Sequence, residues 1–289
     1  MKPAPFNYRA STSIADAVSA LTELGDEAKI LAGGQSLVPM LALRLARPEH
    51  LIDVNRVADL AGAHRDNGHL VVGATTRHAV LGKDPTIGAA VPLLRLAAPY
   101  IGHFQIRSRG TLGGSLAHAD AAAEWPAVVR ALDAEIEVEG PGGTRTIPAA
   151  EFFETTFTTA LAPDELLVAV RFPVWAPTAG FAVQEIARRH GDFAVAGAVC
   201  GVQVADGRVE RVALALIGMG SVPERPTRVE RELLGAQVAG LDLDGIGAAA
   251  VADLDPPSDV HGSGRYRKKV GAVLVGRALT TAIREATSA

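Results

Sequence analysis

The sequence predicts an α+β fold, in which strands and helices do not follow one regular alternation. Near the amino terminus, a helical pattern leads into a short strand. In the middle of the chain, strands at 134–139 and 144–147 flank a Pro-Gly-Gly turn. In the last third, apolar strands at 194–204 and 209–217 are joined by Asp206-Gly207, and helices follow them. This succession is typical of the α+β class.

Composition indicates a globular chain. Its 289 residues are 48% hydrophobic and 21% charged, which leaves room for one large domain or two to three small ones. The net charge of −4 provides no basic field for nucleic acid. No apolar run reaches the ~18 residues of a membrane span, and no signal peptide is evident, so we expect a cytoplasmic protein. The single cysteine, Cys200, excludes an internal disulfide and a cysteine-ligated cluster within this chain.

The first half reads as alternating helices and strands. Ser13 precedes a helix with apolar residues at helical spacing, and Gly25 ends it. Thr76 is expected to cap a helix that runs to Leu81. Residues 106–112 are expected to form a basic connector. The other expected elements are strands at 29–32, 51–55 and 69–74 and helices at 36–41, 91–100 and 126–132.

The second half contains the remaining strands and the longest helix. Pro173, Pro177 and Gly180 interrupt the pattern after a strand at 165–172, and we place a domain boundary there. The other expected elements are a strand at 181–188 and helices at 226–234, 245–254 and 266–285.

Two glycine-paired segments are the most informative feature. They are Ala32-Gly33-Gly34-Gln35-Ser36 and Thr111-Leu112-Gly113-Gly114-Ser115. Glycine permits positive φ and close approach of a ligand to the main chain. Successive N–H groups in such a turn form an electropositive nest suited to phosphate. Two nests, each with a neighbouring hydroxyl, predict a dinucleotide pyrophosphate as ligand, although spacing cannot show that the segments meet.

Other patterns have simpler interpretations. Gly245-Ile246-Gly247-Ala248-Ala249-Ala250 matches a dinucleotide fingerprint, but the preceding segment is too short and polar for a buried strand. We interpret it as a helix of small residues capped by Asp244. The histidines lack metal-site spacing. Arg265, Arg267, Lys268 and Lys269 are expected on a solvated or docking face, and Arg107 and Arg109 at the surface.

Four segments in order along the chain resemble the motifs of one family. They are Ala32 to Ser36, Thr111 to Asp120, Arg188-Arg189-His190-Gly191-Asp192-Phe193-Ala194 and His261-Gly262-Ser263-Gly264-Arg265-Tyr266-Arg267. The chain resembles the FAD-binding medium subunits of molybdenum hydroxylases, which include carbon monoxide dehydrogenase and xanthine dehydrogenase. The resemblance implies a PCMH-type FAD-binding domain at 1–176, with lobes of about 1–56 and 57–176. It also implies a smaller α+β domain at 177–289, with a three-stranded sheet and a helical bundle.

The resemblance also implies roles for single residues. The glycine segments would hold the pyrophosphate, and Ile101 would lie near the adenine. Ala117, His118 and Glu124 would line the ribose and ribityl region, whereas Leu167 and Asp192-Phe193 would flank the isoalloxazine. On this basis Gly114→Val should lose FAD with the fold retained. The implied cofactor-binding residues are Leu31, Ala32, Gly33, Gly34, Gln35, Ser36, Leu37, Ile101, Thr111, Leu112, Gly113, Gly114, Ser115, Ala117, His118, Glu124, Leu167, Asp192 and Phe193.

Two positions depart from the family pattern. Gln184 stands where some relatives have a lysine near the flavin ring. A cation there would stabilise reduced, anionic flavin more than a neutral amide does. Phe193 replaces a tyrosine or tryptophan, so it offers packing without a polar group.

The implied function is electron transfer within a complex. FAD, bound non-covalently, would take electrons from the iron–sulfur clusters of a small partner subunit and pass them to an external acceptor. A large molybdopterin subunit would oxidise the substrate, and the assembly would be a dimer of heterotrimers. No catalytic or metal-ligating residue is expected in this chain. Two alternatives stay open: a self-contained flavin oxidase, and a non-enzymatic dinucleotide-binding assembly protein.

Overall fold

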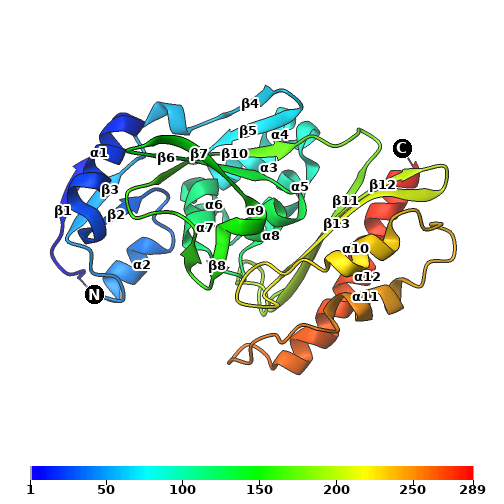
Figure 1. Cartoon of the computed structure of the whole chain (residues 1–289). Helices are drawn as coiled ribbons and strands as arrows, with labels where there is room; N and C mark the ends of the chain where they lie inside the picture. Colours follow the sequence, from blue (N-terminus) through cyan, green and yellow to red (C-terminus); the bar gives the residue numbers. More distant parts are fainter. Residues whose placement is uncertain (1, 289) are drawn as a thin grey trace.

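The computed structural model describes residues 2–288, and no helix in that range is long and apolar enough to cross a membrane. A small parallel sheet lies at one end of the molecule (Figure 1). Its strands, in the order β1-β3-β2, are β1 (Asn7–Ala10), β3 (His50–Asp53) and β2 (Ala28–Leu31). The helix α1 (Ile14–Leu24) begins where the Ser13 hydroxyl accepts the Asp16 N–H, as predicted. The short helix α2 (Leu37–Ala42) follows β2.

The middle of the molecule is built on a five-stranded antiparallel sheet. Its strands, in the order β4-β5-β10-β6-β7, are β4 (Ala63–Asp66), β5 (His69–Gly73), β10 (Leu166–Pro173), β6 (Glu135–Gly140) and β7 (Gly143–Pro148). A separate two-stranded sheet consists of β8 (Phe153–Thr155) and β9 (Thr158–Thr159). The helices of this part are α3 (His78–Lys83), α4 (Pro85–Ala90), α5 (Pro92–Ala97), α6 (Phe104–Arg109), α7 (Leu112–His118), α8 (Glu124–Ala131) and α9 (Ala149–Phe152). Short 3₁₀ turns lie at Gly25–Glu27, Ala58–Leu60 and Ala98–Tyr100.

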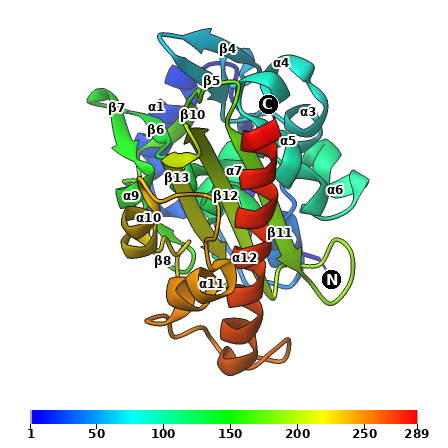
Figure 2. The same ribbon diagram turned by 90° about the vertical axis from the view of Figure 1, so that its right-hand side faces the viewer.

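A third sheet forms the carboxy-terminal part. Its strands are β11 (Gly180–Ile186), β12 (Ala196–Ala205) and β13 (Arg208–Ile217), all antiparallel. Its helices are α10 (Thr227–Leu233), α11 (Leu243–Val251) and α12 (Gly264–Ser288). The long α12 lies across one face of this sheet, and α5 and α8 pack on the other (Figures 1 and 2). One hydrophobic core therefore continues from the middle sheet to this face, and a second lies under α12.

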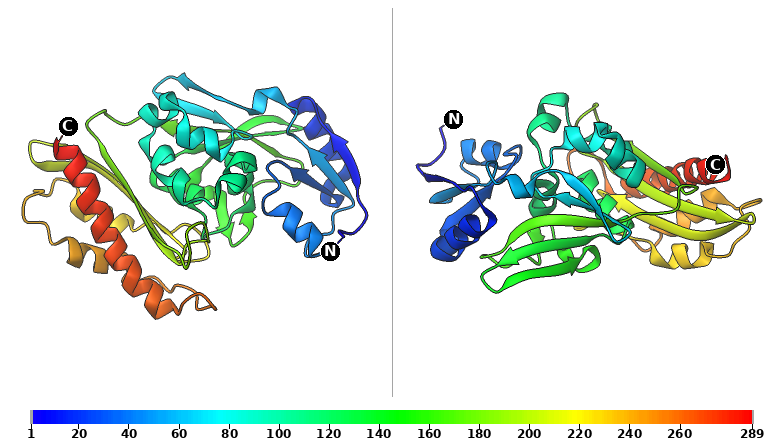
Figure 3. Two further views of the ribbon diagram at one scale, coloured as in Figure 1. Left: turned by 180° about the vertical axis from the view of Figure 1, so that it is seen from behind. Right: turned by 90° about the horizontal axis from the view of Figure 1, so that it is seen from above.

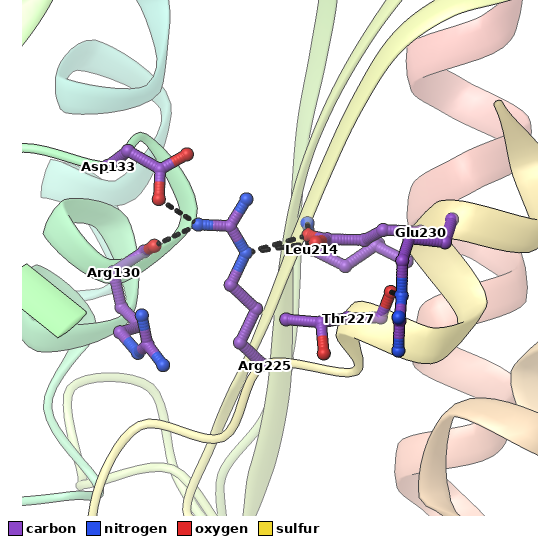
Figure 4. A network of polar contacts seen from close by, with 7 residues as sticks. Arg130, Asp133, Leu214, Arg225, Thr227 and Glu230 are labelled. Atoms are coloured by element: carbon purple, nitrogen blue, oxygen red, sulfur yellow. Dashed lines mark hydrogen bonds and ion pairs between the residues drawn. The ribbon is translucent and has the colours of Figure 1, made fainter.

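A buried ion-pair network also joins the middle and carboxy-terminal parts (Figure 4). The Arg225 Nε donates to both carboxylate oxygens of Glu230, at 2.9 and 3.0 Å. Its Nη1 donates to the Arg130 carbonyl at 3.0 Å and also to the Asp133 carboxylate. Glu230 is 7% exposed and accepts the Leu214 N–H at 2.7 Å. Arg225 thus connects the end of α8 to both β13 and α10.

Several elements differ from the sequence predictions. Thr76 does not cap α3, because its hydroxyl bonds to the backbone of Gly62 while Arg77 occupies the cap position. The helix α11 is capped by Asp242, which accepts the Gly245 N–H at 2.9 Å, and not by Asp244. The predicted connector at 106–112 is mostly the helix α6, which buries no residue and so lacks an apolar stripe. The strands β1, β4, β8 and β9 and the helices α4, α7 and α9 were not predicted.

Candidate functional site

The first glycine segment is an open nest of backbone donors. It follows β2 and enters α2, and Gly34 adopts φ +73°. The Gln35 side-chain amide donates to the Gly33 carbonyl at 3.0 Å, which folds the turn on itself. Among the described residues, none accepts a hydrogen bond from the backbone N–H groups of residues 33–37. Such donors need water or a ligand, and phosphate oxygens are suitable acceptors.

The second glycine segment is a helix start and not an open nest. The Thr111 hydroxyl accepts the Gly114 N–H at 3.2 Å, and the Thr111 carbonyl accepts the Ser115 N–H. The N–H groups of Leu112 and Gly113 bond to the carbonyls of Thr76 and Ala74. The expectation of free N–H groups here is therefore wrong, because capping and packing use them. The Thr111 hydroxyl hydrogen remains able to donate.

The two segments meet. A Cβ placed on Gly33 would lie 2.6 Å from the Arg109 carbonyl oxygen and 2.7 Å from the Gly110 Cα. A Cβ on Gly114 would lie 3.6 Å from the Ala32 Cβ, but only 2.7 Å from the Thr111 Oγ1. Gly114→Val is therefore expected to lose FAD for a different reason: the valine would clash with the Thr111 hydroxyl that caps α7, and not with the phosphate. The absence of a side chain at Gly33 is what allows the backbones to touch.

Two residues that sequence reasoning missed hold the segments together. The Asn55 side-chain amide donates to the Ala32 carbonyl at 2.8 Å. The Arg77 guanidinium donates to the Asn55 Oδ1 at 2.7 Å and to the Arg109 carbonyl at 2.5 Å. Asn55 follows the carboxyl end of a parallel strand, where ligands commonly bind, so its position was a usable signal. Burial and the charge of Arg109 lower the pKa of Arg77. Arginine still stays protonated at neutral pH, so both side chains contribute positive charge here.

The buried imidazole of His78 packs against Gly110, just before the second glycine segment. The Trp125 Nε1 donates to the His78 Nδ1 at 2.8 Å, so this imidazole is neutral and carries its hydrogen on Nε2. Burial lowers the pKa of His78 to about 3. A Cβ on Gly110 would lie 2.5 Å from His78. The turn between α6 and α7 therefore packs against a buried, uncharged imidazole that is fixed by its hydrogen bond to Trp125.

The other residues that the resemblance places near the cofactor differ in how deeply they are buried. His118, at the end of α7, stacks on Phe157 with ring centroids 4.9 Å apart, and burial lowers its pKa. Glu124, at the start of α8, is 5% exposed. Leu167 lies in the main core on β10. Ile101 is half-buried after the 3₁₀ turn at Ala98–Tyr100, whereas Ala117 is exposed.

The segment between β11 and β12 carries Asp192 and Phe193, and Phe193 is 61% exposed. It contacts the middle part of the chain, because a Cβ on Gly191 would lie 2.8 Å from the His103 ring. Arg267 fixes its end by donating to the Val195 carbonyl at 2.5 Å and to Asp259 at 2.7 Å. Arg267 is thus buried, which corrects its expected place on a solvated face.

Two surface hollows lie away from these segments. One, of about 330 Å³, is lined by α10 and α11, and the other, of about 900 Å³, by α1 and the turn between β6 and β7. None of the implied cofactor-binding residues lines either hollow. The glycine segments are therefore distinguished by their backbone donors and not by an enclosed volume.

Comparisons with known proteins agree over nearly the whole chain. Residues 4–175 match the family "FAD binding domain in molybdopterin dehydrogenase", and residues 181–282 match "CO dehydrogenase flavoprotein C-terminal domain". The 6-hydroxypseudooxynicotine dehydrogenase complex subunit alpha of Paenarthrobacter nicotinovorans is 42% identical, over 99% of this chain and 97% of that protein. The carbon monoxide dehydrogenase medium chain of Hydrogenophaga pseudoflava is 37% identical, over 98% of both chains.

Solved structures show the same fold. A chain of carbon monoxide dehydrogenase from Hydrogenophaga pseudoflava, in a form that lacks the Mo-pyranopterin moiety, superposes with a TM-score of 0.96 at 38% identity and 99% coverage of both chains. A chain of quinoline 2-oxidoreductase from Pseudomonas putida 86 gives 0.94 at 34% identity, again over 99% of each chain. This protein is therefore an oxidoreductase flavoprotein subunit and belongs to the family of FAD-binding medium subunits of molybdenum hydroxylases.

Proposed function

We propose that this chain binds FAD non-covalently, with the pyrophosphate on the backbone N–H groups of residues 33–37. The observation that carries the proposal is this row of N–H groups without acceptors, lying against the start of α7. The Thr111 hydroxyl and the positive charge of Arg77 and Arg109 add to the attraction for phosphate. The observed donors thus fit a diphosphate.

The rest of the cofactor would extend from this point along the residues that the family resemblance implies. Ile101 would contact the adenine, and Ala117, His118 and Glu124 the ribose and ribityl chain. Leu167, Asp192 and Phe193 would flank the isoalloxazine, and Gln184 would leave it without a nearby cation. Bound FAD supplies reversible uptake and release of electrons. The chain's own residues bind it, orient it and set the charge around it.

We also propose that the chain serves as the electron-transfer subunit of a larger complex. Its partners would be a small iron–sulfur subunit and a large molybdopterin subunit, in a dimer of heterotrimers. The relatives named above include a subunit of a dehydrogenase complex and a medium chain. Cys200 is buried, and burial raises the pKa of its thiol, so it offers no cluster ligand. A cytoplasmic location is part of the proposal.

The proposal includes a domain limit at 176/177, with lobes of about 1–56 and 57–176. The three-stranded parallel sheet, the five-stranded sheet and the carboxy-terminal sheet share no strands, which supports these limits (Figure 3).

The first test is the flavin content of the purified full chain. We expect equimolar FAD after incubation with the cofactor, and we expect acid precipitation to release it into the supernatant. Flavin that stays with the precipitate would indicate a covalent link and the self-contained oxidase. A folded chain that stays colourless with added FAD would contradict the proposal altogether. Copurification with the two partner chains, and reduction of the FAD by substrate only in their presence, tests the electron-transfer role.

A further inference from the structure

A half-buried carboxylate lies next to the residues that join the two glycine segments. Asp53 is the last residue of β3, and its Oδ2 accepts the Tyr8 hydroxyl hydrogen at 2.6 Å. Its Oδ1 accepts two hydrogens of Asn55, from the backbone N–H at 2.7 Å and from the side-chain Nδ2 at 2.6 Å. Burial alone would raise the pKa of Asp53, but the hydrogen bonds from Tyr8 and Asn55 and the charge of Arg56 lower it. Asp53 is therefore ionised at neutral pH.

The charge of Asp53 decides which way the Asn55 amide faces. An ionised carboxylate only accepts hydrogen bonds, so it holds the amide nitrogen and not the amide oxygen. The other Nδ2 hydrogen then reaches the Ala32 carbonyl, at 2.8 Å, in the first glycine segment. The Asn55 Oδ1 faces the other way and accepts a hydrogen from the Arg77 Nη2 at 2.7 Å. A turned amide would place its oxygen against two acceptors and its nitrogen against a donor.

Arg77 extends this arrangement to the second glycine segment. Its planar guanidinium donates to the Asn55 Oδ1 through one nitrogen and to the Arg109 carbonyl, at 2.5 Å, through another. The same Arg109 carbonyl is the atom against which Gly33 packs. A continuous series of hydrogen bonds therefore runs from Asp53 through Asn55 and Arg77 to the backbone just before the second segment.

We propose that Asp53 is a positioning residue of the candidate FAD site, which orients the Asn55 amide and thereby holds the two glycine segments against each other. The inference rests on the proposed function, because it concerns the same site. Asp53 belongs to neither glycine segment and acts on the cofactor only through Asn55. Without its carboxylate the amide is free to turn, so the Ala32 carbonyl and Arg77 lose a fixed partner. The N–H groups of residues 33–37 then lose their fixed place beside the second segment.

A purely structural role for Asp53 makes a different prediction. Asp53 also holds β1, through the Tyr8 hydroxyl and through its own carbonyl, which accepts the Ser11 N–H at 2.9 Å. If this were its whole effect, removing the carboxylate would weaken the small parallel sheet independently of Asn55. If Asp53 orients the amide, its effect on FAD affinity disappears once the amide is gone. A double-mutant cycle separates these two roles.

The cycle compares the full chain with Asp53→Ala, Asn55→Ala and the double variant, and quenching of flavin fluorescence gives the dissociation constant of FAD for each. Asp53→Ala should weaken binding by about 10-fold, the usual effect of losing one hydrogen bond to a charged group. Adding Asp53→Ala to Asn55→Ala should cause no further loss. Asp53→Asn keeps an acceptor oxygen for the Asn55 amide and should recover part of the affinity. The matched control Asp59→Ala removes an exposed aspartate from the 3₁₀ turn after β3 and should bind FAD like the wild type.

Equal FAD affinity of the wild type and folded Asp53→Ala, or additive losses in the double variant, would overturn the inference. Circular dichroism shows whether each variant is folded. If Asp53→Ala is not, Asp53→Asn, which keeps the shape of the side chain, takes its place in the cycle, and its smaller loss should again be absent beside Asn55→Ala. A wild type that binds no FAD contradicts the proposed function itself, whereas wild-type binding with additive losses contradicts only the role of Asp53.

Discussion

Gly33→Ala should weaken FAD binding by about 10- to 100-fold. The new Cβ would lie 2.6 Å from the Arg109 carbonyl and 2.7 Å from the Gly110 Cα, and neither backbone atom can rotate away. The two segments must separate, which turns the N–H groups of residues 33–37 away from the diphosphate. Losing one charge-assisted hydrogen bond costs roughly 1.5–3 kcal/mol, which corresponds to this range of dissociation constants. Quenching of flavin fluorescence on titration measures the effect.

Gly142→Ala is the matched control, because a Cβ at that hairpin position meets nothing within 4 Å. It should bind FAD like the wild type. Asn55→Ala is a second variant that leaves the backbone unaltered but removes the amide bonded to the Ala32 carbonyl. It too should weaken binding, while circular dichroism shows a retained fold. If folded Gly33→Ala and Asn55→Ala both bound FAD with wild-type affinity, the contact between the two glycine segments would not hold the cofactor.

Arg225→Ala should destabilise the chain by about 3–5 kcal/mol, the usual cost of leaving a buried charge unpaired. Glu230 would keep only the Leu214 N–H, and the end of α8 would lose its link to β13 and α10 (Figure 4). Urea unfolding at pH 7 measures the change.

The control for this prediction is Arg228→Ala. Arg228 pairs with Glu232 one helical turn away, and both side chains are more than half exposed, so the loss should be small. The double variant Arg225→Met with Glu230→Leu should recover part of the stability, because it leaves neither charge behind although the Leu214 N–H loses its acceptor. Equal unfolding midpoints for Arg225→Ala and Arg228→Ala would contradict this account of the network.

Local signals predicted much of the fold. Ser13 and Gly25 limit α1 as expected, and Asp206-Gly207 joins β12 to β13 with φ of 50° and 71°. Several short elements escaped prediction. The strand β1 has only four residues and is mostly exposed, and its pairing with β3 is decided by a segment 40 residues further along the chain.

The site was predictable only in part. A Gly-Gly pair can expose backbone donors or allow close packing, and local sequence does not distinguish these causes. Gly34, with its positive φ, belongs to the turn that exposes backbone donors. Gly113 instead allows close packing, because a Cβ there would lie 2.6 Å from the Ala74 Cβ. Asn55 and Arg77 join segments that are distant in sequence, so no spacing could reveal their hydrogen bonds. The order of four motifs along the chain, and not any one of them, identified the family.

The most direct test is an experimental structure of the full chain with FAD bound. We predict that the phosphate oxygens accept hydrogen bonds from the backbone N–H groups of residues 33–37 and lie beside Thr111 at the start of α7. A pyrophosphate bound elsewhere, or residues 33–37 donating to protein or water while FAD occupies another surface, would contradict the account.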